Sequence, residues 1–118
     1  MTPVHVQFRG EPARPVVALS GEVDASNADD LAERISRAVG NEALSLVLDL
    51  SGVTYLDSSG VRLVFRLSRG LRNRQQDLHL VIPHGSRVRR PLHLSGVDVV
   101  ASVVADTASL PQLDVEGV

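Results

Sequence analysis

The tetrapeptide Asp57-Ser58-Ser59-Gly60 carries the side chains of this chain that are best suited to chemistry. It interrupts the apolar run TYLDSSGVRLVFRL at residues 54–67, after which the apolar residues resume with a different spacing. A serine hydroxyl in such a place can act as a nucleophile, accept a phosphate or simply complete a turn. The rest of the sequence bears on which of these roles applies.

A nucleophilic serine needs a general base and an oxyanion hole. The chain contains four histidines, but it has no G-x-S-x-G motif and no recognisable oxyanion loop. The sequence therefore argues against hydrolase chemistry and favours a protein that is not an enzyme.

The second role, phosphate acceptance, suits Ser58. The apolar spacing predicts a helix that starts here, and the free N–H groups and dipole of a helix N-terminus favour an anion. Asp57 is placed as the N-cap, with its carboxylate accepting from the backbone N–H of Ser59 or Gly60. Phosphorylation of Ser58 would add about −1.5 to −2 of charge at an accessible turn. A plain turn without any regulatory role is the alternative interpretation.

Length and composition limit the class of protein. The chain has 118 residues, 43% of them hydrophobic, which is enough for one domain with its own core. It has no cysteine, its N-terminus lacks the apolar core of a signal peptide, and no apolar run approaches the roughly 20 residues of a membrane span. We expect a cytoplasmic protein without a membrane partner.

The charged residues exclude two further classes. All twelve basic residues are arginine, so a phosphate-binding loop with Gly-Lys-Ser/Thr cannot occur. Aromatic residues make up only 3% of the chain and the net charge is −2, which argues against binding to nucleic acid.

The elements that must position the tetrapeptide follow from the apolar pattern, which predicts the order β-β-α-β-α-β-α-β. Strands are expected at 4–8, 15–20, 44–50, 77–82 and 98–104, and the first two form a hairpin with a longer turn. Helices are expected at 26–40, 58–73 and 87–95, and TASLPQL near the end is expected to turn helical. Pro91 falls inside the third helix, which either begins near it or is kinked.

This order indicates an α/β fold, a mixed and mostly parallel sheet with an N-terminal antiparallel hairpin. Leu44, Leu46, Leu48 and Leu50 share one face of their strand and alternate with more polar residues, so helices are expected mainly on one face of the sheet. We predict a single domain over residues 1–118, with its core at about 4–110 and a C-terminal end that frays after Pro111.

Three segments together resemble the STAS domain, the sulphate transporter and anti-sigma factor antagonist family. They are LSGEVDASNADDL (19–31), LVLDLSGVTYLDSSGVRLV (46–64) and VRRPLHLSGVDVV (88–100). The resemblance covers about residues 4–110, and it rests on the order and intervals of these motifs more than on any one of them.

Free-standing domains of this family resemble bacterial anti-sigma factor antagonists, which regulate transcription by partner switching. The resemblance implies that the unmodified protein binds an anti-sigma factor with serine kinase activity and thereby releases a sigma factor. It also implies that this kinase phosphorylates Ser58, that the phosphate blocks binding, and that a serine phosphatase reverses the modification.

The predicted partner-binding surface is centred on this turn, and the resemblance places Asp24 and Asn27 close to it. For Asp24, helix capping or loop solvation is the alternative role. Arg62, Arg66 and Arg69 form one helical stripe that either meets an acidic partner or is a solvated face. The predicted surface consists of Asp24, Asn27, Thr54, Asp57, Ser58, Ser59, Gly60 and Arg62.

Two other functions stay open at this point. One is a non-switching STAS subunit of a lipid-transport or stress-signalling complex, in which Ser58 is not modified. The other is a small nucleotide-binding module, with phosphate held at the Ser58 helix end or at His84-Gly85-Ser86. No cofactor or metal is expected, because His79 and His84 lack acids placed to complete a site.

Overall fold

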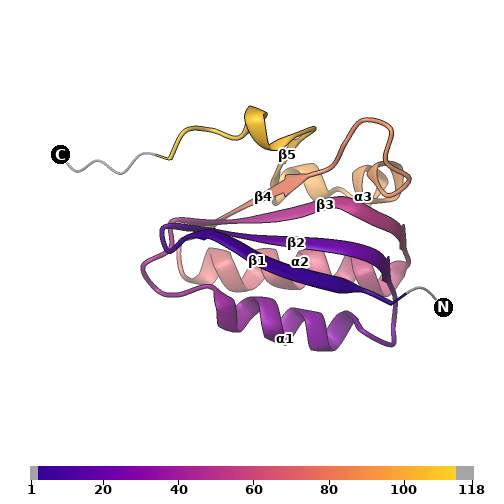
Figure 1. The fold of residues 1–118 in the computed structure, drawn as a ribbon, viewed down its shortest axis with the longest axis horizontal. Helices are drawn as coiled ribbons and strands as arrows, with labels where there is room; N and C mark the ends of the chain where they lie inside the picture. The colour runs from indigo at the N-terminus through magenta and orange to yellow at the C-terminus, as the bar shows by residue number, and fades with distance from the viewer. Residues whose placement is uncertain (1–2, 114–118) are drawn as a thin grey trace.

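The computed structural model describes residues 3–113, in which a five-stranded sheet is combined with helices (Figure 1). The elements in chain order are β1 (His5–Glu11), β2 (Arg14–Val23), α1 (Ala28–Ala38), β3 (Ser45–Leu56), α2 (Ser58–Asn73), β4 (Asp77–Val81), α3 (Arg89–Leu94), the 3₁₀ turn η1 (Val97–Val99), β5 (Ser102–Val104) and the 3₁₀ turn η2 (Thr107–Ser109). The fraying predicted after Pro111 falls mostly on residues 114–118, which lie outside the described range.

The strands lie in the order β1-β2-β3-β4-β5, with β1 antiparallel to β2 and all other pairs parallel. The predicted mixed sheet is therefore confirmed. The expected longer turn in the hairpin is wrong, because pairing continues to Glu11 and Arg14 and leaves only two residues between the strands. Gly10 has a φ of 89°, and this left-handed conformation lets β1 continue into a tight turn.

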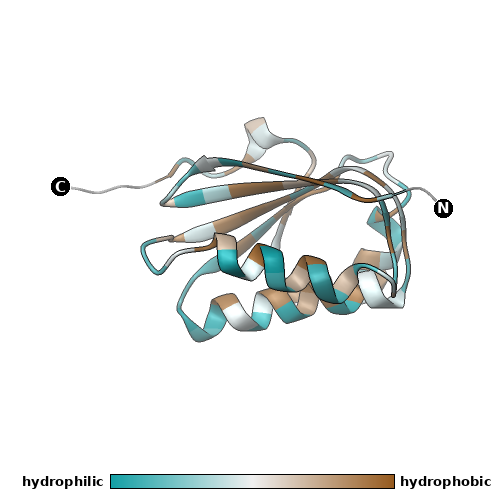
Figure 2. Cartoon of the chain, turned by 60° about the horizontal axis from the view of Figure 1, so that its bottom comes forward, coloured by the Kyte–Doolittle hydropathy of each residue, from teal (hydrophilic) through white to brown (hydrophobic). Residues whose placement is uncertain are grey.

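Helices α1 and α2 pack side by side on one face of the sheet, as the alternating leucines predicted (Figures 1 and 2). Figure 2 shows hydrophilic colour on the outer turns of both helices and hydrophobic colour along the strands. Helix α3 and η1 add Val88, Leu92 and Val97 to the same core. The largest fully buried side chains include Leu19, Leu31, Ile35, Leu46, Leu48, Leu50, Leu80 and Leu92.

Leu44 departs from this pattern. It lies before the start of β3 and is 50% exposed, although its backbone pairs with both neighbours of the strand. Its N–H donates to the Ala13 carbonyl at 2.8 Å, and its carbonyl accepts from Asp77 N–H at 3.2 Å. Leu44 is therefore not part of the buried core, to which Leu46, Leu48 and Leu50 contribute.

The predicted strand over 98–104 is also wrong in its first half. Gly96 has a φ of 87° and turns the chain, and the N–H groups of Val100 and Ala101 both donate to the Val97 carbonyl at 3.0 Å. These local hydrogen bonds form η1 and leave only residues 102–104 to pair with β4 as β5. The helical turn expected in TASLPQL is limited to η2.

The alternatives for Pro91 are resolved by the start of α3. The helix begins at Arg89, so Pro91 is its third residue, where a backbone N–H would have no partner within the helix. The first intrahelical bond runs from Leu92 N–H to the Val88 carbonyl at 3.2 Å. Proline therefore fits this first turn without a kink.

His79 lies on β4, between the parallel strands β3 and β5, and is 9% exposed. Its Nδ1 is buried and has no hydrogen-bond partner within the described residues. Burial lowers the pKa of His79 below its usual 6.5, and nearby Arg14 lowers that pKa further, while Asp77 acts in the opposite direction. Folding therefore favours the neutral form of the His79 ring.

We predict that the free energy of unfolding falls as the pH drops below about 6.5. The unfolded chain binds a proton at His79 more readily than the folded chain, so acid favours unfolding between pH 6.5 and the lowered folded pKa. His79→Leu removes this contribution, and urea titrations from pH 8 to about pH 5 should show a flatter stability profile. Equal slopes for both proteins would contradict the prediction.

Candidate functional site

The parallel pairing of β2 and β3 brings two turns to the same edge of the sheet. Val23 and Leu56, the last residues of the two strands, are register partners. The N–H of Asp57 donates to the Val23 carbonyl at 3.3 Å, which ties the second turn to the first. The turn after β2 and the turn that starts α2 therefore form one surface.

Asp57 caps α2 as predicted. Its backbone is extended, and its Oδ1 accepts from the N–H of Ser59 at 2.8 Å and of Gly60 at 3.3 Å. Two of the free N–H groups of the helix end are satisfied in this way. Ser58 is consequently the first residue of α2.

The two serines have different surroundings. Ser58 is exposed, and its hydroxyl makes no hydrogen bond in the part of the chain that the structure describes. Ser59 is half-buried, and its Oγ accepts from Nη2 of Arg62 at 3.3 Å. Gly60 is buried, and a Cβ at this position would lie 2.5 Å from Cγ of Leu56. Of these residues, Ser58 has the hydroxyl that a partner can reach.

Asp24 and Asn27 hold the neighbouring turn together. Oδ1 of Asp24 accepts from both N–H and Oγ of Ser26, at 2.9 and 2.5 Å. The side chain of Asn27 accepts from Asp24 N–H at 3.1 Å and donates to the Glu22 carbonyl at 2.9 Å. These contacts give both residues a structural role in the loop.

Thr54 and Tyr55 lie on β3 just before the second turn. Thr54 is exposed, and its Oγ1 donates to the Gly21 carbonyl at 3.3 Å. Tyr55 is 50% exposed, although the sequence analysis did not include it in the predicted surface. The position of Tyr55, an aromatic residue two positions before Asp57, could have indicated that it belongs to this surface.

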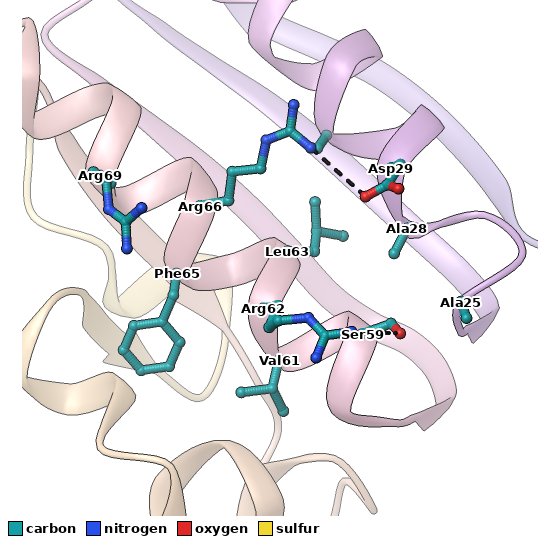
Figure 3. A pocket seen from close by; sticks show the side chains of 11 residues that line it. Ala25, Ala28, Asp29, Ser59, Val61, Arg62, Leu63, Phe65, Arg66 and Arg69 are labelled. Atoms are coloured by element: carbon teal, nitrogen blue, oxygen red, sulfur yellow. Dashed lines mark hydrogen bonds and ion pairs between the residues drawn. The ribbon is translucent and has the colours of Figure 1, made fainter.

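A groove runs along α2 next to this turn and was also missed (Figure 3). Ala28 and Asp29 of α1 lie on one side of it, and Arg66 reaches across towards Asp29. The groove forms where α1 and α2 pack together, and the sequence did not specify the geometry of that packing. Its lining consists of Ala25, Ala28, Asp29, Ala32, Ser59, Val61, Arg62, Leu63, Phe65, Arg66 and Arg69.

Within residues 3–113, no three His, Asp or Glu side chains gather where a metal ion could be held. None of the helices described in the same range has the length and apolar character that crossing a membrane requires.

The family model described as "Mlab, STAS domain" matches residues 6–117. The chain belongs to the STAS domain family. This STAS domain is 36% identical over 83 residues to the anti-sigma-F factor antagonist RsfB of Mycobacterium tuberculosis, and the match covers 70% of this chain and 66% of RsfB. The match thus spans slightly less than two thirds of the relative's length.

Solved structures agree with this assignment. An anti-sigma factor antagonist from Mycobacterium paratuberculosis superposes with a TM-score of 0.78 at 26% identity, covering 90% of this chain and 89% of the other. The antagonist SpoIIAA in its unphosphorylated form has a TM-score of 0.68 at 22% identity, covering 88% and 91%. This second similarity concerns the fold.

Proposed function

We propose that this STAS domain is an anti-sigma factor antagonist that works by partner switching. The names of its relatives support the class of function. The observation that carries the proposal is the exposed hydroxyl of Ser58 on the first residue of α2, directly after the capping carboxylate of Asp57. A kinase can reach this hydroxyl without unfolding the helix.

The proposed partners are an anti-sigma factor with serine kinase activity and a serine phosphatase, which act on the domain in the cytoplasm. The domain itself is the substrate of these enzymes. Its unmodified form binds the anti-sigma factor through the predicted surface and releases a sigma factor. This proposed surface consists of Asp24, Asn27, Thr54, Asp57, Ser58, Ser59, Gly60 and Arg62.

Electrostatics explain how one phosphate can prevent binding. In the free protein, water and the helix N-terminus stabilise the phosphate on Ser58. In the complex, the phosphate and the Asp57 carboxylate would both lose water while lying next to each other. Removing like charges from water together is costly, and the phosphate also fills the space of the contact.

Phosphate mapping tests this proposal. The tagged domain is used to capture its partner, which mass spectrometry identifies, and the two purified proteins are incubated with ATP. We expect phosphate on Ser58 and none on Ser58→Ala, while the matched variant Ser59→Ala is still modified. Phosphate on another residue, or none, would overturn the switching mechanism. Capture of ABC transporter subunits in place of a kinase would favour the non-switching subunit.

A further inference from the structure

The groove along α2 has properties of a docking site that the Ser58 turn does not explain. It has a volume of about 480 Å³ and begins at Ser59, so it continues from the proposed contact surface. Figure 3 shows Arg62, Arg66 and Arg69 along the outer side of α2. We call this feature the arginine groove, defined by these three arginines together with Asp29, Val61 and Phe65.

The positive charge of the arginine groove is poorly compensated. Helix α2 contains no acidic residue. Arg66 lies 3.7 Å from Asp29, whose side chain is 99% exposed, and such a solvated pair contributes little. Within the described residues, Arg62 and Arg69 have no ion pair at all.

The acids of α1 do not supply this compensation, because they pair within their own helix. Asp30 lies 3.8 Å from Arg34, and Glu33 lies 3.4 Å from Arg37. Only Asp29 reaches the groove. The three arginines therefore offer a row of cationic groups to solvent at i, i+4 and i+7 spacing.

Apolar side chains accompany this row. Leu63 is 4% exposed and Ala28 of α1 is 5% exposed, so these two side chains form the floor of the groove and offer little apolar surface to a ligand. The apolar surface beside the arginines comes from Val61 and Phe65, which also line the groove, are half-buried and point away from α1 (Figure 3). A ligand that fits must combine negative charge with an apolar stripe.

We propose that the arginine groove docks an acidic amphipathic helix of a partner protein. Carboxylates spaced by three and four residues on one helix face match the spacing of Arg62, Arg66 and Arg69. Asp29 at the rim provides one acceptor for a basic residue of the same helix. This inference rests on the proposed function in one respect, that the helix belongs to the anti-sigma factor that covers Ser58.

The composition of the groove favours a protein ligand over nucleic acid. Phe65 is its one aromatic lining residue, so it offers no row of aromatic rings on which successive bases could stack. The exposed carboxylate of Asp29 would repel a phosphate backbone at the rim. Exposed arginines facing an acidic partner act mainly on the rate of association, which they raise by long-range attraction.

The first test needs no natural partner. A synthetic helical peptide with glutamates at i, i+4 and i+7 and leucines between them is added to the nitrogen-15-labelled protein, and a peptide with lysines in place of the glutamates is the control. We expect amide shifts at residues 62–69 with the acidic peptide alone, and their loss in Arg62→Glu/Arg69→Glu. Shifts confined to another surface, or binding only to DNA or anionic vesicles, would overturn the proposal.

The second test uses the captured anti-sigma factor. Arg62→Glu/Arg69→Glu should lower its association rate roughly tenfold at low salt and reduce the salt dependence of that rate. The matched control Arg87→Glu/Arg90→Glu makes the same charge change at exposed positions outside the groove and should have a much smaller effect. If both pairs act equally, the groove is not the docking site.

The two tests separate the groove from the proposed function. If Ser58→Glu abolishes binding but the groove variant binds normally, the groove proposal fails together with Arg62 as a contact residue, and partner switching at Ser58 stands. If no anti-sigma factor is captured, the peptide experiment still decides whether the groove takes an acidic helix.

Discussion

Ser58→Glu is expected to weaken the complex with the anti-sigma factor by roughly a hundredfold, equivalent to about 3 kcal/mol. Its carboxylate would lie beside Asp57 and would have to lose water in the interface without a partner. Ser58→Ala removes only a hydroxyl, so its affinity should change by less than about tenfold. Titration calorimetry with the purified anti-sigma factor measures both values.

A matched control separates the position of the charge from the charge itself. Thr107 is the first residue of η2 and follows the capping residue Asp106, as Ser58 follows Asp57. Figure 1 shows this C-terminal segment on the side of the sheet away from α1 and α2. Thr107→Glu should leave the affinity unchanged. Equal loss of binding in both glutamate variants would argue against a contact at Ser58.

Gly60→Val is expected to lower the free energy of unfolding by about 1–3 kcal/mol. The Cβ of the new side chain would come 2.5 Å from Cγ and 3.0 Å from Cδ1 of Leu56, which is 8% exposed. Leu56 must then move out of its packed position at the end of β3. Chemical denaturation of the isolated protein measures this loss without any partner.

Gly70 is the matched control for Gly60, because both glycines lie in α2. A Cβ at Gly70 would meet nothing within 4 Å, and valine forms helices better than glycine. Gly70→Val should therefore leave stability unchanged or raise it slightly. If Gly60→Val is as stable as Gly70→Val, the close packing of Gly60 on Leu56 is not a constraint on the fold.

The parts that were predictable from sequence are those encoded by local pattern. The 3.6-residue spacing of apolar residues gave α2 its correct range, and Asp57 before it satisfied the rule for an N-cap. The expectation that Asp24 and Asn27 lie beside this turn rested instead on the resemblance to the STAS family. The parallel pairing of β2 and β3 explains their position, because parallel strands end at the same edge of a sheet.

The remaining parts depend on contacts between distant segments. Val47 is fully buried although it lies on the sheet face away from α1 and α2, so alternation alone did not separate buried from exposed positions in β3. The run at 98–104 is rich in valine like a strand, yet hydrogen bonds to the Val97 carbonyl turn its first half. The arginine groove exists because α1 lies beside α2, and neither helix alone encodes that distance.

The cap at Asp57 has a consequence for how a signal is stored. The N–H groups of Ser59 and Gly60 already donate to its carboxylate, so the helix is capped without any phosphate. Phosphorylation and dephosphorylation of Ser58 then require no segment of the domain to fold, unfold or exchange its contacts. The phosphorylated and unmodified domains would therefore have the same fold and differ only at the Ser58 side chain. A partner can distinguish them only by contacting that side chain directly.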